Sequence, residues 1–107
     1  MPTIRIDYDD KKVTDEQILE LSSALQKIVH EVTGIEDVFV YANPPRITVK
    51  NAPIEIYIQI SAQKIADIDV LFDDIKKPLS DWKKSNAFPI PLNMTLMPMQ
   101  WKFEIDI

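Results

Sequence analysis

The first residues of the chain alternate between apolar and polar side chains. Within residues 3–8, Ile4, Ile6 and Tyr8 fall on one face and polar side chains fall on the other. A side-chain period of two is typical of a β-strand that buries one face. The pattern therefore predicts a strand over residues 3–8.

A helical period follows a short charged turn. From Ile18 onward, apolar residues recur at steps of three and four, which places them in one stripe along a helix. Thr14 followed by Gln17 matches a capping box, and Gly34 suits the left-handed position after a helix. These signals predict a helix over about residues 15–33.

The same order of elements recurs in the second half of the chain. Residues 38–41 are apolar and β-branched or aromatic, which predicts a strand with both faces buried. Residues 54–61 alternate strictly and predict a further strand. Apolar residues then follow helical spacing over residues 65–82. Pro78 lies inside that stripe, and because proline lacks the N–H donor, we expect a kink or a break near Lys77.

The last residues again favour extended structure. Residues 94–97 predict a fourth strand, and Pro98 predicts a bend after it. Over residues 101–107 apolar side chains alternate with charged ones, which predicts an additional C-terminal strand.

This order predicts an α/β (α+β) fold in a single domain, residues 1–107. Two tandem βαβ units, about residues 2–50 and 53–107, would form one four-stranded mixed sheet with two helices on one face, plus the C-terminal strand. The opposite face of the sheet would be partly polar, carrying Arg5, Asp7, Glu55, Tyr57 and Gln59. An oligomer would cover this face and give the last strand a neighbour; a solvated open face is the alternative.

Composition excludes several function classes. The chain has no Cys, one Gly and one His. It can therefore form no disulfide or cysteine-ligated zinc site, no glycine-rich phosphate loop and no multi-histidine metal site. A net charge of −5 argues against nucleic acid, and no apolar run is long enough to span a membrane. We expect a cytoplasmic protein that uses no metal or cofactor.

Pro2, directly after the initiator, is the sharpest chemical feature. Removal of Met1 would expose a secondary amine at Pro2, and a free α-amine titrates near neutral pH. Desolvation or a nearby cation disfavours the protonated form, so this nitrogen could act as a base. Alternatively, Pro2 simply begins an edge strand.

Longer stretches of the sequence resemble a known family. Residues 2–8, together with Lys12 and the helix cap at residues 14–17, resemble the N-terminus of the tautomerase superfamily. This is the fold of 4-oxalocrotonate tautomerase, 5-carboxymethyl-2-hydroxymuconate isomerase and macrophage migration inhibitory factor. The likeness continues through residues 38–41 and the proline-rich loop at residues 44–45. With the tandem βαβ units, it covers nearly the whole chain.

The resemblance implies a homotrimer with sites at subunit boundaries and a small-molecule substrate. Pro2 would be the catalytic base that moves a proton between carbon and oxygen of a small 2-oxo or 2-hydroxy-dienoic acid. Lys12, with Lys11 as an alternative, and Arg46 would bind the substrate's carboxylate or carbonyl group. Trp101 would wall an apolar pocket. A cation suits this chemistry because it stabilises an enolate.

Other readings of these residues stay open. Lys11 and Lys12 could be a solvated turn, Arg46 a surface charge, and Trp101 a packing residue. Residues 47–50 replace the glycines often found in this loop of the family, and Lys64 is the nearest cation where some members carry an arginine. The alternatives are a non-catalytic oligomeric binding or structural protein that retains the fold, and a ferredoxin-like regulatory module.

Overall fold

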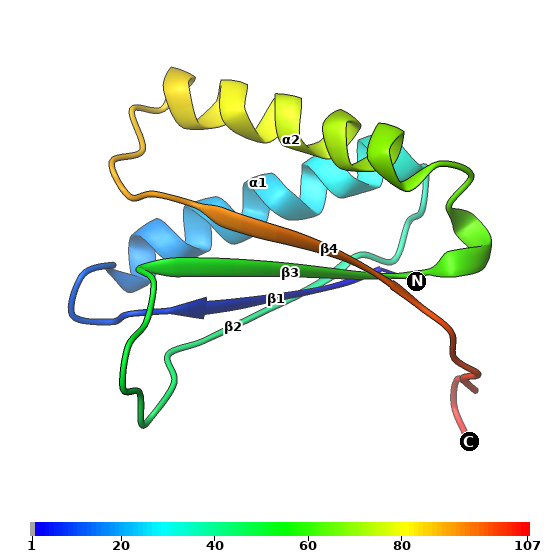
Figure 1. The fold of residues 1–107 in the computed structure, drawn as a ribbon, viewed down its shortest axis with the longest axis horizontal. Helices are drawn as coiled ribbons and strands as arrows, with labels where there is room; N and C mark the ends of the chain where they lie inside the picture. The colour runs from blue at the N-terminus through cyan, green and yellow to red at the C-terminus, as the bar shows by residue number, and fades with distance from the viewer. Residues whose placement is uncertain (1) are drawn as a thin grey trace.

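The computed structural model describes residues 2–107 (Figure 1). These residues contain two helices and four strands, with a short 3-10 turn, η1, between the third strand and the second helix. In chain order they are β1 (Thr3–Tyr8), α1 (Asp15–Thr33), β2 (Phe39–Asn43), β3 (Ile54–Ser61), η1 (Ala62–Lys64), α2 (Ile68–Ser85) and β4 (Asn93–Met99).

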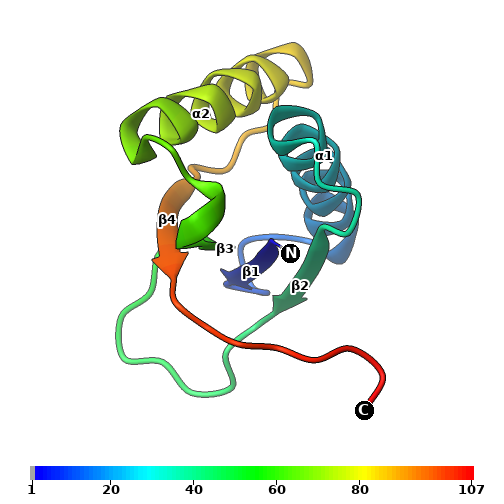
Figure 2. The same cartoon turned by 90° about the vertical axis from the view of Figure 1, so that its right-hand side faces the viewer.

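The strands form one mixed sheet in the order β2-β1-β3-β4. β1 and β3 pair antiparallel in the centre, and each pairs in parallel with an outer strand, β2 and β4 respectively. Both helices cover the same face of the sheet (Figure 2). The predicted tandem βαβ units and mixed sheet are confirmed. The ferredoxin-like alternative predicted an antiparallel sheet, and the two parallel pairs exclude it.

The first helix has the bounds and caps that the sequence predicted. The Thr14 hydroxyl accepts a hydrogen bond from the Gln17 backbone N–H at 3.1 Å, and the Gln17 side chain accepts one from the Thr14 N–H at 2.9 Å. At the other end Gly34 adopts φ 71°, and its N–H donates to the His30 carbonyl group at 2.8 Å. Both ends of α1 are therefore fixed by local hydrogen bonds.

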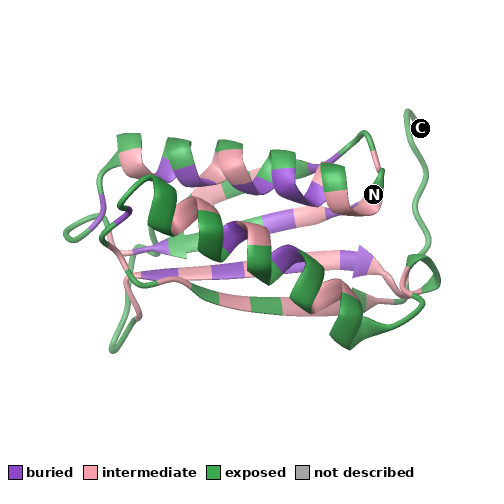
Figure 3. Cartoon of the chain, turned by 90° about the horizontal axis from the view of Figure 1, so that it is seen from above, coloured by how far each residue is buried: buried purple, intermediate pink, exposed green. Residues whose placement is uncertain are grey.

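The core lies between the central strands and the helices (Figure 3). Every second residue of β1 and β3 points toward the helices, and α1 presents one buried stripe to them. Burial of these aliphatic side chains is the main force that holds the layers together. The most deeply buried of them are Ile4, Ile6, Leu21, Leu25, Val29, Ile54, Ile56, Ile58, Ile60 and Ile75.

Of the kink or break predicted near Lys77, the break does not occur. α2 runs as one helix through Pro78 to its end. A proline in a helix interior costs about 3 kcal/mol. Ile75 and Leu79, on either side of Pro78, are buried against the core, and each such side chain contributes about 1.5–3 kcal/mol. Tertiary packing therefore offsets the lost hydrogen bond.

The C-terminal segment also departs from the prediction. β4 continues through Pro98. It is an edge strand, the position in a sheet where proline is tolerated. Residues 101–107 form no strand. After β4 they cross below the end of the sheet toward the β2 side (Figure 2). Among residues 2–107 no strand pairs with them, so their alternating pattern finds no β-ladder there.

The strand at the other edge was predicted to be buried on both faces, and this is wrong. On the face of β2 turned away from the helices, Phe39 and Tyr41 are 42% and 50% exposed. Their exposure arises because both helices lie on the opposite face.

In the region that the structure describes, neither helix is long and apolar enough to cross a membrane.

Candidate functional site

Pro2 lies at the end of the sheet where β1 begins and β3 ends. It is less than 2% exposed, and its carbonyl group accepts a hydrogen bond from the Phe39 N–H at 3.3 Å. Because β1 and β3 are antiparallel, Thr3 pairs with Gln59. η1, which follows β3 directly, therefore lies at the Pro2 end and brings Lys64 there from the same chain.

Trp101 also lies at the Pro2 end. The segment after β4 crosses this end of the sheet, where Trp101, Lys102 and Phe103 line a hollow of about 240 Å³ together with Thr3. Trp101 is half-buried, whereas Phe103 is exposed. The structure thus brings one predicted site residue, Trp101, against the residue that follows Pro2.

The predicted cations lie at the opposite end of β1. Lys11 and Arg46 line a polar hollow of about 480 Å³ that also contains Tyr8, Asp9, Asp10, Pro44, Pro45, Thr48 and Asn51. Lys12 does not line this hollow; it is exposed, and its N–H donates to the Asp9 carbonyl group at 3.0 Å. The Asp9 carboxylate accepts a hydrogen bond from the Lys11 N–H at 3.0 Å, so this turn is also stabilised locally.

Tyr8 forms a neutral wall of the same hollow. Its hydroxyl group donates a hydrogen bond to Asp15 Oδ1 at 3.1 Å. Burial raises the pKa of Tyr8 above its ordinary value of 10.0, and the neighbouring Asp15 carboxylate raises it further. The phenol is therefore uncharged at physiological pH, and the charges in this hollow come from two acidic and two basic side chains.

The separation of the two ends decides which residues can meet. β1 has six residues, and at about 3.3 Å per residue it spans roughly 20 Å. Pro2 and the pair Lys11 and Arg46 lie at opposite ends of that strand, so they do not meet within one chain. The separation of Pro2 from Lys11 follows from the length of β1, which the sequence predicted, whereas the position of Arg46 follows from the pairing of β2 with β1.

The sheet face turned away from the helices is the one that the sequence predicted to be partly polar. The guanidinium carbon of Arg5 lies 5.8 Å from the centre of the Tyr41 ring. Asp7 and Arg5 are exposed, and Tyr57 is half-buried. Within residues 2–107, no three acidic or histidine side chains come together closely enough to hold a metal ion. This face therefore offers aromatic and charged contacts to a partner molecule.

Comparison with solved structures identifies the fold. Malonate semialdehyde decarboxylase matches with a TM-score of 0.67 at 14% identity, over 98% of this chain and 92% of that one. A fused 4-OT solved as an asymmetric trimer matches with a TM-score of 0.62 at 14% identity, over 91% and 85%. A macrophage migration inhibitory factor-like protein from Entamoeba histolytica matches with a TM-score of 0.57 at 16% identity, over 96% and 95%.

The chain therefore has the fold of the tautomerase superfamily, as the resemblance in its sequence predicted. No protein-family model and no curated protein sequence matches it. At these identities the likeness establishes the architecture, and the chemistry has to be argued from the residues of this chain.

Proposed function

We propose that this chain is a tautomerase-like isomerase that interconverts the keto and enol forms of a small 2-oxo or 2-hydroxy-dienoic acid. The observation that carries this proposal is the position of Pro2, buried at the end of the sheet in this fold. The malonate semialdehyde decarboxylase of similar fold has been solved as the wild type and as a mutant whose proline at position 1 is alanine.

The proposed chemistry starts with removal of Met1, which makes the Pro2 nitrogen a secondary amine. An amine that is shielded from water disfavours its charged ammonium form, and such shielding would keep the Pro2 nitrogen available as a base. The amine takes the proton from the hydroxyl group of the dienol, and the resulting pyrrolidinium returns a proton to carbon. The proton is conserved in this cycle, so the step requires no cofactor.

The negative charge on the enolate oxygen requires a nearby cation. Arg46 and Lys11, with Lys12 next to them, are the candidates, and they lie about 20 Å from Pro2 within one chain. For Arg46 or Lys11 to serve the site, a second copy would have to bring its cation-lined end to the Pro2 end of the first; Lys64 is the cation that the same chain brings there. This requirement supports a homotrimer with shared sites, the assembly that the resemblance implies, and Trp101 would line the apolar side of each site.

A rate assay on phenylenolpyruvate tests the proposal. Intact-mass measurement first establishes that Met1 has been removed. We expect Pro2→Ala to lower the rate of ketonisation by about 100-fold or more, the usual contribution of a general base. Pro53→Ala is the matched control, because Pro53 directly precedes β3 as Pro2 precedes β1. Equal rates for Pro2→Ala and the unaltered protein would remove Pro2 from the mechanism.

One observation favours a second candidate, a non-catalytic oligomeric binding protein that retains the fold. Asp9 and Asp10 line the same hollow as Lys11 and Arg46, and their carboxylates oppose the binding of an anion. Retention of Met1 on protein isolated from its own host would favour this candidate, because an amide nitrogen cannot act as a base.

The cytoplasmic location stays a proposal that rests on the absence of cysteine.

A further inference from the structure

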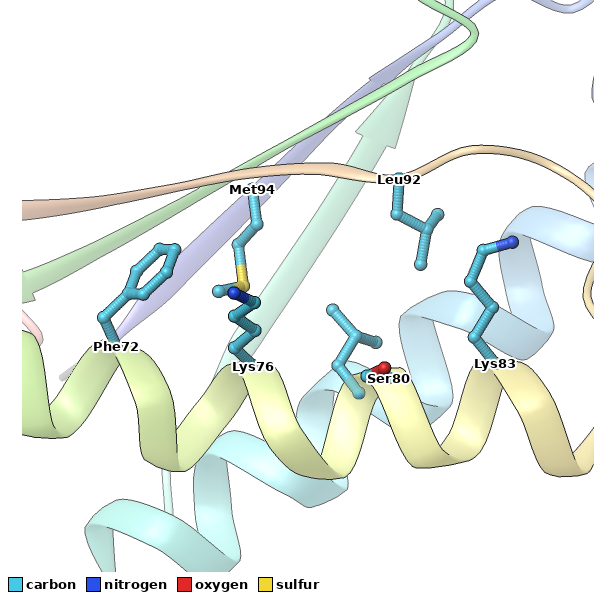
Figure 4. Close-up of a pocket in the computed structure, with 7 residues that line it drawn as sticks. Phe72, Lys76, Ser80, Lys83, Leu92 and Met94 are labelled. Carbon is cyan, nitrogen blue, oxygen red and sulfur yellow. The ribbon is translucent and has the colours of Figure 1, made fainter.

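A separate hollow lies between α2 and the outer strand β4, and neither Pro2 nor Lys11 nor Arg46 lines it. Its volume is about 270 Å³, and seven residues line it: Phe72, Lys76, Leu79, Ser80, Lys83, Leu92 and Met94. Figure 4 shows Leu92 and Met94 extending from the β4 side toward α2, while Phe72 and the two lysines extend from α2 toward β4. The hollow is therefore formed by two elements that face each other.

The interior of this hollow is apolar. Phe72, Leu79, Leu92 and Met94 supply aromatic, aliphatic and thioether surface, and Leu79 is itself buried in the core. Each CH₂ group that a ligand buries against such surface contributes about 0.8 kcal/mol, so a chain of several carbons gains affinity here. Methionine adapts to ligands of different shape because its side chain is flexible.

The charged groups of the hollow are all positive. Lys76 and Lys83 are seven residues apart, which puts them on the same side of α2 at a separation of about 10 Å along the axis. Lys83 Nζ donates a hydrogen bond to the Phe88 carbonyl group at 2.9 Å, which holds its ammonium group at one end of the hollow. Two of its three N–H donors are left for a ligand.

Neither lysine is paired with an acid. No acidic residue lines the hollow, and within the described chain neither Lys76 nor Lys83 forms an ion pair. The chain as a whole carries a net charge of −5, whereas the two charged side chains that line this apolar hollow are both positive. Such a site complements a ligand with one anionic head and an apolar body.

We propose that the hollow between α2 and β4 binds a small amphipathic monocarboxylate, such as a medium-chain fatty acid. The carboxylate accepts hydrogen bonds from the ammonium group of Lys83, with Lys76 as the second cation. The hydrocarbon chain lies against Leu79, Leu92 and Met94. The site contains neither Pro2 nor the cations of the proposed isomerase. This binding proposal is therefore independent of the proposed function.

Titration of the ¹⁵N-labelled protein with octanoate, followed by amide chemical shifts, tests the site. We expect saturable shifts at Phe72, Lys76, Lys83 and Met94, and much weaker binding of butyrate because its chain is shorter. Octylamine has the same chain and the opposite charge. We expect it to bind at least ten-fold more weakly than octanoate, and the affinity for octanoate to fall as salt is added.

Charge reversal provides the matched control. Lys76→Glu together with Lys83→Glu should weaken octanoate binding at least ten-fold. Lys77→Glu together with Lys84→Glu changes the net charge of the same helix equally, outside the hollow, and should leave the affinity within two-fold. Lys76→Glu alone keeps the hydrogen bond from Lys83 to Phe88. If the double variant fails to fold, weaker octanoate binding by this single variant tests the proposal instead.

Three results would overturn the proposal. Octanoate and octylamine could bind equally, in which case the lysines only cover apolar surface with their stems. The shifts could map to the Pro2 end of the sheet or to another surface. The control pair at Lys77 and Lys84 could weaken binding as much as the pair in the hollow. Loss of isomerase activity in Pro2→Ala has no bearing on any of these results.

Discussion

Mixed oligomers offer the strongest test of the shared site. Pro2→Ala removes the proposed base, and Arg46→Ala removes a proposed cation from the other end of β1. Each variant alone should be nearly inactive toward phenylenolpyruvate. If every site takes Pro2 from one copy and Arg46 from another, an oligomer that contains both variants should regain activity.

The size of the recovery follows from the geometry. Pro2 and Arg46 are separated by roughly 20 Å of strand in one chain, so an intact site needs an unaltered residue from each of two copies. In a random one-to-one mixture, each requirement is met half of the time. About a quarter of the sites are then intact before fractionation. A trimer that contains both variants has one intact site in three, so mixed trimers purified as such should reach about a third of the unaltered rate per chain.

The assay uses the two variants expressed together, each with a different C-terminal tag so that the Pro2 nitrogen stays free. Purification on both tags isolates mixed oligomers, and native mass spectrometry verifies their composition. Lys50→Ala is the control for Arg46→Ala. Lys50 is an exposed cation of the same loop, but it does not line the hollow that contains Arg46. Mixtures of Pro2→Ala with Lys50→Ala should retain the activity of the Lys50→Ala chain.

A mixed oligomer no more active than its two variants would refute the shared site. Full activity of Arg46→Ala alone would exclude that residue as the cation. If Lys64→Ala then lost activity, the cation would come from the same chain, since Lys64 lies at the Pro2 end. A fully active monomer would refute the whole arrangement.

Three further predictions concern stability and use the midpoint and slope of urea unfolding. Leu25→Ala should lower the free energy of unfolding by about 2–5 kcal/mol because Leu25 is fully buried. Leu19 is 68% exposed, so Leu19→Ala should change that free energy by less than about 0.5 kcal/mol. Equal effects of the two substitutions would contradict the placement of Leu25 in the core. Thr14→Ala should cost about 1 kcal/mol through loss of the helix cap, and no change would mean that the capping box contributes nothing. Because the pKa of Tyr8 is raised in the folded chain, the unfolded chain loses its phenol proton first as pH rises through 10.0. The stability that is present below this pH is therefore lost above it, and Tyr8→Phe should abolish this loss. Parallel profiles of stability against pH for the two proteins would argue against this reasoning.

The sequence predicted those parts of the fold that depend on neighbouring residues. The bounds of α1 were correct because the Thr14 cap and Gly34 are local signals. β3 was equally clear, since its alternation of isoleucine with other side chains requires one buried face. The break predicted near Lys77 as one alternative does not occur, because Ile75 and Leu79 pack against a sheet that is distant in sequence, and the helix sequence alone does not indicate that packing.

Features that depend on pairing between distant segments could not be predicted. The alternation over residues 101–107 indicates a strand, but a strand needs a partner edge, and this chain offers none to that segment. The family resemblance grouped the site residues, whereas the antiparallel pairing of β1 with β3 puts Lys64 at the Pro2 end, and the parallel pairing of β1 with β2 puts Arg46 at the other. Sequence reasoning therefore named candidate residues without their spatial relation.

The antiparallel pair of β1 and β3 gives the molecule an approximate internal two-fold axis. The two ends of the sheet are therefore similar, but they differ in the chemistry that their prolines can perform. Each half starts with a proline directly before a central strand, Pro2 before β1 and Pro53 before β3. Only the first can become an amine, because the nitrogen of Pro53 is always part of a peptide bond. A scaffold with two similar ends can thus carry the proposed base at only one of them, and an assembly of such chains would have at most one basic nitrogen of this kind for each subunit.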